Sequence, residues 1–211
     1  MSDGGRGRYA PSIRRREQIA RAALQQIVEN GHAAMSVSQV ASAAGVSERT
    51  LYYHFPTREH VLVAALELSD ERTTDEIGGR DDDDFAEMDD VVAGLARLGA
   101  EHPWLVRLMV YLSARAQEPG HPAHAYFRRH NAEAIRSFAT LLRHRQRRGL
   151  AHPDLEPEVV ARRLVAAWDG LQAQWLVEPD FDLADEISAA FRQLTGQNVM
   201  EARSAFERAL A

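Results

Sequence analysis

Two short helical segments on either side of Gly45-Val46-Ser47 constrain the fold more than any other part of this sequence. Gly45 is typical of a helix end, since glycine adopts a left-handed backbone conformation without steric cost. Ser47 can cap the helix that follows it, and Pro56 ends that helix. We therefore expect helices over about 37–44 and 48–54, joined by a tight turn, which is a helix-turn-helix.

The second of these helices carries more polar and aromatic side chains than it can bury. Leu51 and Phe55 are about one turn apart, so both are expected to face the protein core. A helix of this length is marginal in water by itself, and neighbouring helices must hold it. The side chains left on the solvent side or its flanks are Arg49, Thr50, Tyr52 and Tyr53.

These exposed side chains suit the major groove of DNA. An arginine such as Arg49 can bind O6 and N7 of guanine with two hydrogen bonds, whereas tyrosine hydroxyls and His54 can donate to phosphate. Arg58 follows at the start of the next helix, where its charge and the helix amides can both meet a phosphate. A helical hairpin with exposed aromatic residues explains the same pattern, so DNA binding is a hypothesis at this point.

Charge is distributed unevenly along the chain. The net charge is −6, which by itself argues weakly against a nucleic-acid partner. Residues 1–60, however, hold eight arginines against five acidic residues, a net charge of +3, and the remainder carries −9. A basic N-terminal quarter on an acidic body is the asymmetry expected of a small DNA-reading head on a larger regulatory body.

The composition excludes several chemistries. The chain contains no cysteine and no lysine, which removes thiol catalysis, disulfides, lysine Schiff bases and the lysine of a phosphate-binding loop. We find no hydrolase or zinc-peptidase motif, so we expect no enzyme activity, no metal and no cofactor. The N-terminus lacks an apolar signal core, and the longest apolar run is far too short to cross a bilayer, which indicates a cytoplasmic protein.

Helical periodicity continues through the rest of the chain, and no strand pattern of useful length appears. The first helix of the head is expected from Ser12 to about Asn30, with Gly31 as its stop. Further helices are expected at about 85–101, 104–117, 122–148, 157–177, 183–195 and 198–210. We predict an all-α protein with a flexible basic arm (1–11), a three-helix head containing the helix-turn-helix (12–56), a connecting helix (57–77), a linker (78–84), and a helical ligand-binding and dimerisation bundle (85–211).

Several short motifs follow one another in a recognisable order. Ser36-Val37-Ser38-Gln39 has the pattern of a capping box, in which Ser36 caps the third amide and Gln39 reaches back. Leu51-Tyr52-Tyr53-His54-Phe55 is followed directly by Pro56-Thr57-Arg58-Glu59, where Thr57 can cap a further helix. Over about residues 13–68, this order resembles the N-terminal domain of TetR-family transcriptional regulators.

The resemblance implies an all-helical homodimer with a divergent C-terminal ligand domain. Arg58 departs from the lysine that is more common in the family, but it keeps the positive charge. The candidate DNA-contact positions are Ser36, Ser38, Ser47, Arg49, Thr50, Tyr52, Tyr53, His54 and Arg58.

The C-terminal body resembles a subset of the same family. The stretches 149–158 and 168–176 are similar to the regulatory domain of the betaine-inhibitor type, which implies a two-helix dimer face but transfers no ligand. Gly170 lies inside an expected helix, where glycine costs about 1 kcal/mol relative to alanine. Close packing against another helix would explain a glycine at this position. An intramolecular core is the alternative to a dimer face. The residues expected in the face are Leu164, Ala167, Gly170, Leu171, Trp175, Ile187, Phe191 and Leu194.

Aromatic residues on neighbouring helices of the body form either plain core or the wall of a ligand cavity. His121 and His124 are two possible metal ligands without a third, so no metal site is predicted. The candidate ligand contacts are Trp104, Arg107, Tyr111, Tyr126, Trp168 and Gln172.

Taken together, these patterns indicate a ligand-responsive regulator that binds double-stranded DNA as a homodimer and has no membrane partner. We expect a repressor that an unknown small molecule releases from a palindromic operator. The alternative is a small-molecule-binding or enzymatic α-helical protein whose N-terminal head only packs, supported if turnover depended on an acid such as Asp169. A third hypothesis, DNA coating without sequence preference, predicts equal competition by any duplex.

Overall fold

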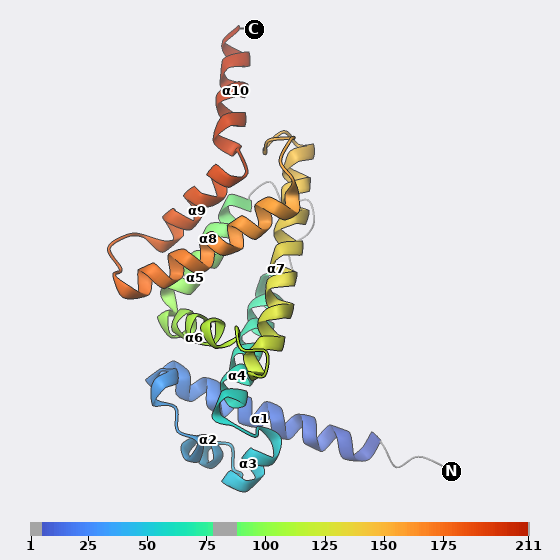
Figure 1. Cartoon of the computed structure of the whole chain (residues 1–211), viewed down its shortest axis with the longest axis vertical. Coiled ribbons are helices and arrows are strands. Elements are labelled where there is room, and N and C mark those ends of the chain that lie inside the picture. The colour runs from blue at the N-terminus through green and yellow to red at the C-terminus, as the bar shows by residue number, and fades with distance from the viewer. Residues whose placement is uncertain (1–5, 78–87, 211) are drawn as a thin grey trace. The chain divides into compact units, whose positions relative to one another are not determined.

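A computed structural model describes residues 6–77 and 88–210 of the chain. Within these two ranges the chain forms ten α-helices and one short 3-10 helix and no strand, which confirms the all-α class (Figure 1). The chain divides into two compact units, one made of residues 1–80 and 107–126 and the other of residues 81–106 and 127–211.

The first unit contains the helix-turn-helix. Helix α1 packs along α4, and Ile19, Ile27, Leu62 and Leu66 are among the side chains that these two helices bury. Its N-terminal elements are α1 (Arg6–Asn30), the 3-10 helix η1 (His32–Ala34), α2 (Val37–Ala43), α3 (Glu48–His54) and α4 (Arg58–Ile77). Parts of α6 and α7 complete this unit.

The first helix begins earlier than the sequence suggested. Residues 6–11, expected in a flexible arm, belong to α1, and Pro11 lies inside the helix. Helix propensity does not account for this extension, because Gly7 and Pro11 both oppose a helix. Residues 1–5 of the expected arm and the linker expected at 78–84 lie outside the described residues.

The second unit is built on helices that agree with the expected ranges to within a few residues at each end. Helices α5, α8 and α9 pack together and share a core that includes Val92, Leu164, Leu183 and Ile187. The elements that contribute to it are α5 (Met88–Glu101), α6 (Pro103–Arg115), α7 (Pro122–Arg147), α8 (Pro157–Val177), α9 (Leu183–Leu194) and α10 (Gln197–Leu210). None of the helices in the described ranges has the length and apolarity needed to span a membrane.

Candidate nucleic-acid interface

The turn between α2 and α3 has the geometry of a glycine-terminated helix end. Gly45 has a φ of 62°, in the left-handed region. Val46 N donates to Ala41 O over 2.9 Å and Gly45 N donates to Ser42 O over 3.0 Å, which is the paired bonding of a Schellman motif. These two bonds occupy carbonyls at the end of α2 and direct the chain into α3.

Helix α3 is held by a cap at one end and by apolar contacts on one side. Ser47 Oγ accepts a hydrogen bond of 3.1 Å from Thr50 N, as expected for an N-cap. Leu51 and Phe55 are 0% and 1% exposed. The guanidinium of Arg16 on α1 lies 4.3 Å from the ring centroid of Phe55 and donates to His54 O over 2.5 Å. Helix α1 thus fixes the C-terminal end of α3 through backbone, charge and ring contacts.

The opposite side of α3 faces solvent. Tyr53 is 83% exposed and Tyr52 is 45% exposed, and Arg49 is exposed between the turn and these two rings. Ser38 on α2 and Ser47 are exposed as well, whereas Thr50 is half-buried. One short helix therefore presents a guanidinium and two phenols from a rigid backbone, which is what base and phosphate contacts require.

His54 sits at the C-terminal edge of this surface. Its ring meets the Tyr53 ring edge-on, with 5.2 Å between centroids. Burial lowers the pKa of His54, and the positive charges of Arg16 and Arg15 lower that pKa further. In the absence of DNA, both effects favour the neutral form of the imidazole.

Arg58 is engaged inside the protein, which the sequence did not indicate. Its Nε donates to Met35 O over 3.4 Å, and its Nη2 donates to the carbonyl oxygens of His32 and, at 3.4 Å, of Ala33. The guanidinium thus ties the start of α4 to η1 and the residue after it. The guanidinium serves these carbonyls within the chain, and the phosphate contact expected of Arg58 stays a prediction.

The capping box expected at the start of α2 is wrong in its detail. Ser36 is at the N-cap position, but its side chain makes no cap hydrogen bond. Its Oγ lies 2.9 Å from Ser38 Oγ instead. The two hydroxyls satisfy each other locally, because short polar side chains have several nearby partners to choose from.

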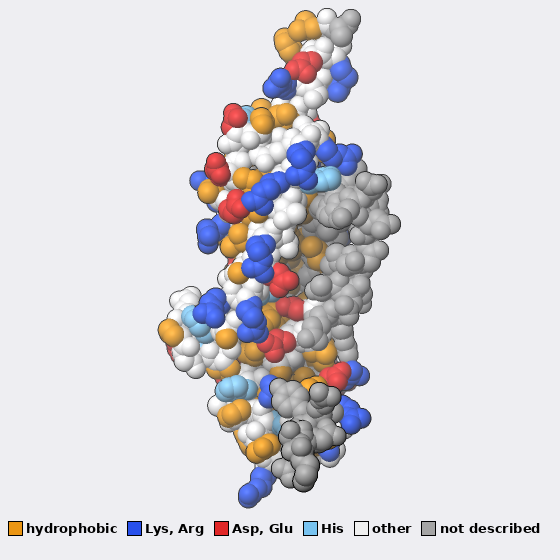
Figure 2. Space-filling view, turned by 90° about the vertical axis from the view of Figure 1, so that its right-hand side faces the viewer, with side chains coloured by type: hydrophobic (Ala, Val, Ile, Leu, Met, Phe, Trp, Pro, Cys, Tyr) orange, Lys and Arg blue, Asp and Glu red, His pale blue; other side chains and the backbone are white. Residues whose placement is uncertain are grey.

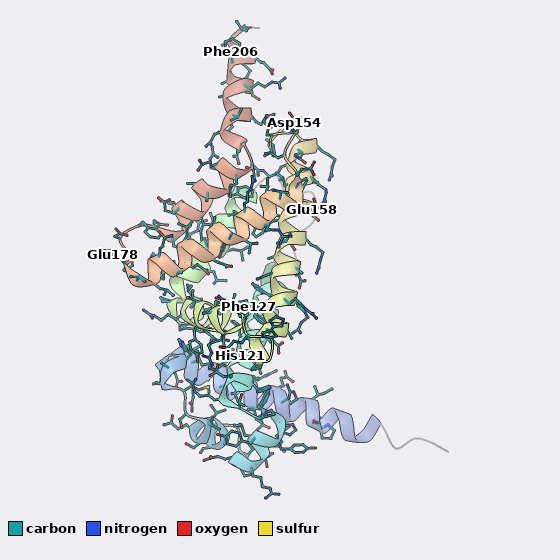
Figure 3. The ribbon with its side chains drawn as sticks, in the orientation of Figure 1. His121, Phe127, Asp154, Glu158, Glu178 and Phe206 are labelled. Carbon is teal, nitrogen blue, oxygen red and sulfur yellow. The ribbon has the colours of Figure 1, made fainter. Side chains whose placement is uncertain are left out.

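A polar cluster in the first unit was not predicted from the sequence. Glu59, in the first turn of α4, accepts a hydrogen bond of 3.1 Å from Tyr111 OH and lies 3.6 Å from His121 Nε2. The Tyr111 ring stacks on His32 with 4.8 Å between centroids. His121 lies at the start of α7 (Figure 3). In the sequence, only the Pro-Thr-Arg-Glu motif drew attention to Glu59. Its two partners, Tyr111 and His121, are 52 and 62 residues further along the chain.

The ligand candidates are distributed over both units. Arg107, Tyr111 and Tyr126 belong to the first unit, where Tyr126 OH donates to Asp70. Trp104, Trp168 and Gln172 belong to the second unit. There, Trp168 packs at 6.3 Å from the Phe138 ring. Tyr111 and Tyr126 thus have internal acidic partners that account for their positions without a ligand.

Three residues of the expected dimer face are core residues of the single chain. Leu164, Ile187 and Phe191 are at most 2% exposed and belong to the cluster shared by α5, α8 and α9. A side chain buried in this way has no surface to offer a partner. The sequence-based assignment of these three residues to the dimer face is therefore wrong. Those that remain partly accessible are Ala167, Gly170, Leu171, Trp175 and Leu194.

The fold and this surface define an all-helical protein with a helix-turn-helix. Residues 19–65 match the family model described as bacterial regulatory proteins, tetR family, and residues 124–198 match the MftR C-terminal domain. The two matches together cover more than half of the chain. The chain belongs to the TetR family of DNA-binding transcriptional regulators. Its C-terminal match names a different domain from the betaine-inhibitor type that the sequence suggested.

Known proteins agree with this assignment. The HTH-type transcriptional regulator PksA of Bacillus subtilis (strain 168) is 25% identical over 166 residues, which are 79% of this chain and 80% of PksA. A TetR transcription regulator from Haloarcula marismortui superposes with a TM-score of 0.71 at 21% identity, over 86% of this chain and 96% of that chain. Structures at this level of identity establish the shared fold.

Two further solved structures of the same fold contain small molecules. Thermus thermophilus FadR, a transcriptional repressor in complex with lauroyl-CoA, has a TM-score of 0.59 and 24% identity over 85% of this chain and 92% of that chain. A protein from Saccharomonospora viridis, described as a transcriptional regulator and in complex with choline, has a TM-score of 0.65 and 21% identity over 87% of this chain and 96% of that chain.

Proposed function

We propose that this protein is a homodimeric, ligand-responsive repressor that acts in the cytoplasm and binds a palindromic operator through α2 and α3. The observation that carries the proposal is the two-sided construction of α3. Leu51 and Phe55 are fully buried, while Arg49, Tyr52 and Tyr53 are presented to solvent. A short helix whose exposed face is cationic and aromatic fits the major groove.

The proposed contacts divide into two kinds. Arg49 reads a guanine, because a guanidinium can pair with O6 and N7 together. Ser38, Ser47, Tyr52 and Tyr53 are exposed hydroxyl donors that fix the register by binding phosphates. Thr50 and His54 are half-buried and contribute at the edge of this surface, whereas Arg58 supports it from inside.

A small-molecule effector is the second part of the proposal. Structures with this fold hold ligands as different as choline and lauroyl-CoA, so the fold names no ligand. In the second unit, Trp168 and Gln172 lie on α8 and are half-buried. An effector alters DNA affinity only if it binds one conformation of the dimer more tightly than the other.

The experiment that tests the proposal is selection of bound sequences from a random duplex pool with the purified protein at near-physiological salt. We expect one motif with two-fold symmetry, since a dimer presents two copies of α3 related by a two-fold axis. Recovery of only salt-sensitive background binding would refute sequence-specific reading. A single unpaired half-site would refute the homodimeric operator while leaving DNA reading by α3 intact.

A further inference from the structure

Helix α10 is anchored at one end and exposed along the rest of its length (Figure 1). Arg145 Nη2 donates to Gln197 Oε1 over 2.6 Å, and both of these side chains are buried. Arg192 forms an ion pair of 2.7 Å with Glu201. From Ala202 to the end of the helix, every residue except the half-buried Ser204 is exposed. The match to the C-terminal domain model ends at residue 198, so most of α10 lies beyond the matched residues.

The direction in which α10 leaves α9 is set by close packing at Gly196. This residue has a φ of 66°, and a Cβ built on it would lie 2.9 Å from His152 Cβ. His152 N also donates to Thr195 O over 3.0 Å. A larger residue at this position would have to displace the His152 loop, so the anchor holds α10 in one direction.

The exposed part of α10 carries an apolar stripe. Val199, Phe206 and Leu210 are 59%, 65% and 73% exposed. Hydrophobic side chains are visible on the outer end of this helix in Figure 2, and Phe206 is labelled in Figure 3. With Arg203 these residues follow a spacing of four, three and four, which is the seam pattern of two packed helices. A helix of this length that is held only at one end is marginal in water, so a partner along the stripe would stabilise it.

We propose that the partner is α10 of a second copy of this chain, packed antiparallel across a two-fold axis. In one such register Val199 lies opposite the partner's Leu210, and Arg203 lies opposite the partner's Phe206. Apolar side chains then meet apolar side chains, and each guanidinium meets an aromatic ring, which attracts cations. The stripe is therefore complementary to itself.

Charge and chain position favour a second copy over an unrelated protein. The ionisable side chains of α10 are two acids and two arginines, Glu201, Glu207, Arg203 and Arg208, so two copies of α10 do not repel each other. Helix α10 also follows α9 after Thr195 and Gly196 alone, which makes it continuous with the helix that carries Leu194, a partly accessible residue of the dimer face expected from the sequence. A pair this short buries less than a stable interface needs, so it adds to other dimer contacts. This inference rests on the homodimer of the proposed function.

The test is sedimentation equilibrium of the full chain carrying Phe206→Arg. The substitution brings an arginine against the partner's Arg203 at two symmetric places, and like charges that face each other across an interface oppose association. We expect the dimer dissociation constant to rise by about tenfold or more. Ala205→Arg is the matched control, because it adds the same charge at an exposed position outside the stripe on the same helix. Circular dichroism checks that both variants fold.

A second variant separates the proposed register from a general effect of charge. Phe206→Arg combined with Arg203→Glu places opposite charges across the two-fold axis, and we expect dimerisation to recover to within about threefold of the unmodified chain. A Phe206→Arg chain that dimerises normally would overturn the pairing of α10 while leaving the proposed homodimer in place. Equal disruption by Ala205→Arg would also overturn it. An unmodified chain that stays monomeric at all concentrations would refute the homodimer itself.

Discussion

The hydroxyl of Tyr111 on α6 donates a hydrogen bond of 3.1 Å to the carboxylate of Glu59, in the first turn of α4. Glu59 is flanked by Arg58, whose Nη1 is 3.5 Å away, and by His121 Nε2 at 3.6 Å. Arg58 in turn holds the carbonyls that precede α2. Within the first unit, α6 and the start of α7 therefore contact the residues that position the helix-turn-helix.

Tyr111→Phe removes the donor to Glu59 and leaves a partly buried carboxylate with fewer partners. We expect the free energy of unfolding to fall by about 1–3 kcal/mol, the range for a lost hydrogen bond to a charged group. Urea denaturation measures this change. Tyr53→Phe is the control, since its hydroxyl is on an 83% exposed residue and its removal should change stability by less than about 0.5 kcal/mol. Equal effects of the two substitutions would contradict the role given to Tyr111.

Arg58→Ala should lower the stability of the protein, and its main effect should not be the loss of a DNA contact. The substitution leaves the carbonyls of His32, Ala33 and Met35 without their guanidinium donor, and we expect a loss of about 1–3 kcal/mol in unfolding free energy. Arg58→Lys should recover only part of this loss, because an ammonium cannot span three carbonyls as a planar guanidinium does. Chemical denaturation of both variants checks that Arg58→Lys is intermediate in stability between the unmodified chain and Arg58→Ala. Normal stability combined with weaker binding to all duplexes would instead favour a phosphate contact.

Gly45→Ala and Gly94→Ala should have effects of opposite sign. Gly45 has a φ of 62° at the turn, where a Cβ costs about 1–2 kcal/mol. Gly94 lies inside α5 with open space around it, so alanine there should stabilise the helix by about 0.5–1 kcal/mol. Thermal unfolding of the two variants is the measurement. A stabilising Gly45→Ala would mean that the turn tolerates another backbone conformation.

His32 gives a pH dependence with a defined sign. Burial lowers the pKa of His32, and Arg58 and Arg107 lower that pKa further against an opposing effect of Glu59. The unfolded chain therefore takes up a proton near pH 6.5 that the folded chain resists, so stability is present above that pH and is lost as the pH falls through it. We expect His32→Gln to lose less stability between pH 7.5 and pH 5.0 than the unmodified chain. Urea denaturation at the two pH values measures this, and equal losses of unfolding free energy in His32→Gln and the unmodified chain would rule it out.

The local parts of the fold could be predicted from the sequence because local chemistry determines them. The cap by Ser47, the left-handed Gly45 and the extent of α3 depend on residues within one turn of each other, and all three are confirmed. The inward side of α3 was likewise predicted by the one-turn spacing of Leu51 and Phe55.

The parts that could not be predicted depend on contacts between distant residues. From the sequence, Arg58 is expected to be an exposed cation. Only the position of η1 in the structure shows that its guanidinium donates to the carbonyls of His32 and Met35. Ile187 and Phe191 lie on an amphipathic helix, but periodicity does not tell whether the apolar side meets the same chain or a second one. Glu59 and Tyr126 likewise have partners that are distant in the sequence, Tyr111 and Asp70.

The central claim, that α3 reads bases through Arg49, is tested most directly by comparing the unmodified chain with Arg49→Ala on the selected duplex. The account predicts a loss of affinity of roughly 5- to 150-fold, with preference lost at one base pair of each half-site and with unchanged thermal stability. Arg162→Ala, which removes an exposed arginine from α8, should leave base preference intact. Equal affinity and equal base preference for Arg49→Ala and the unmodified chain would contradict the account.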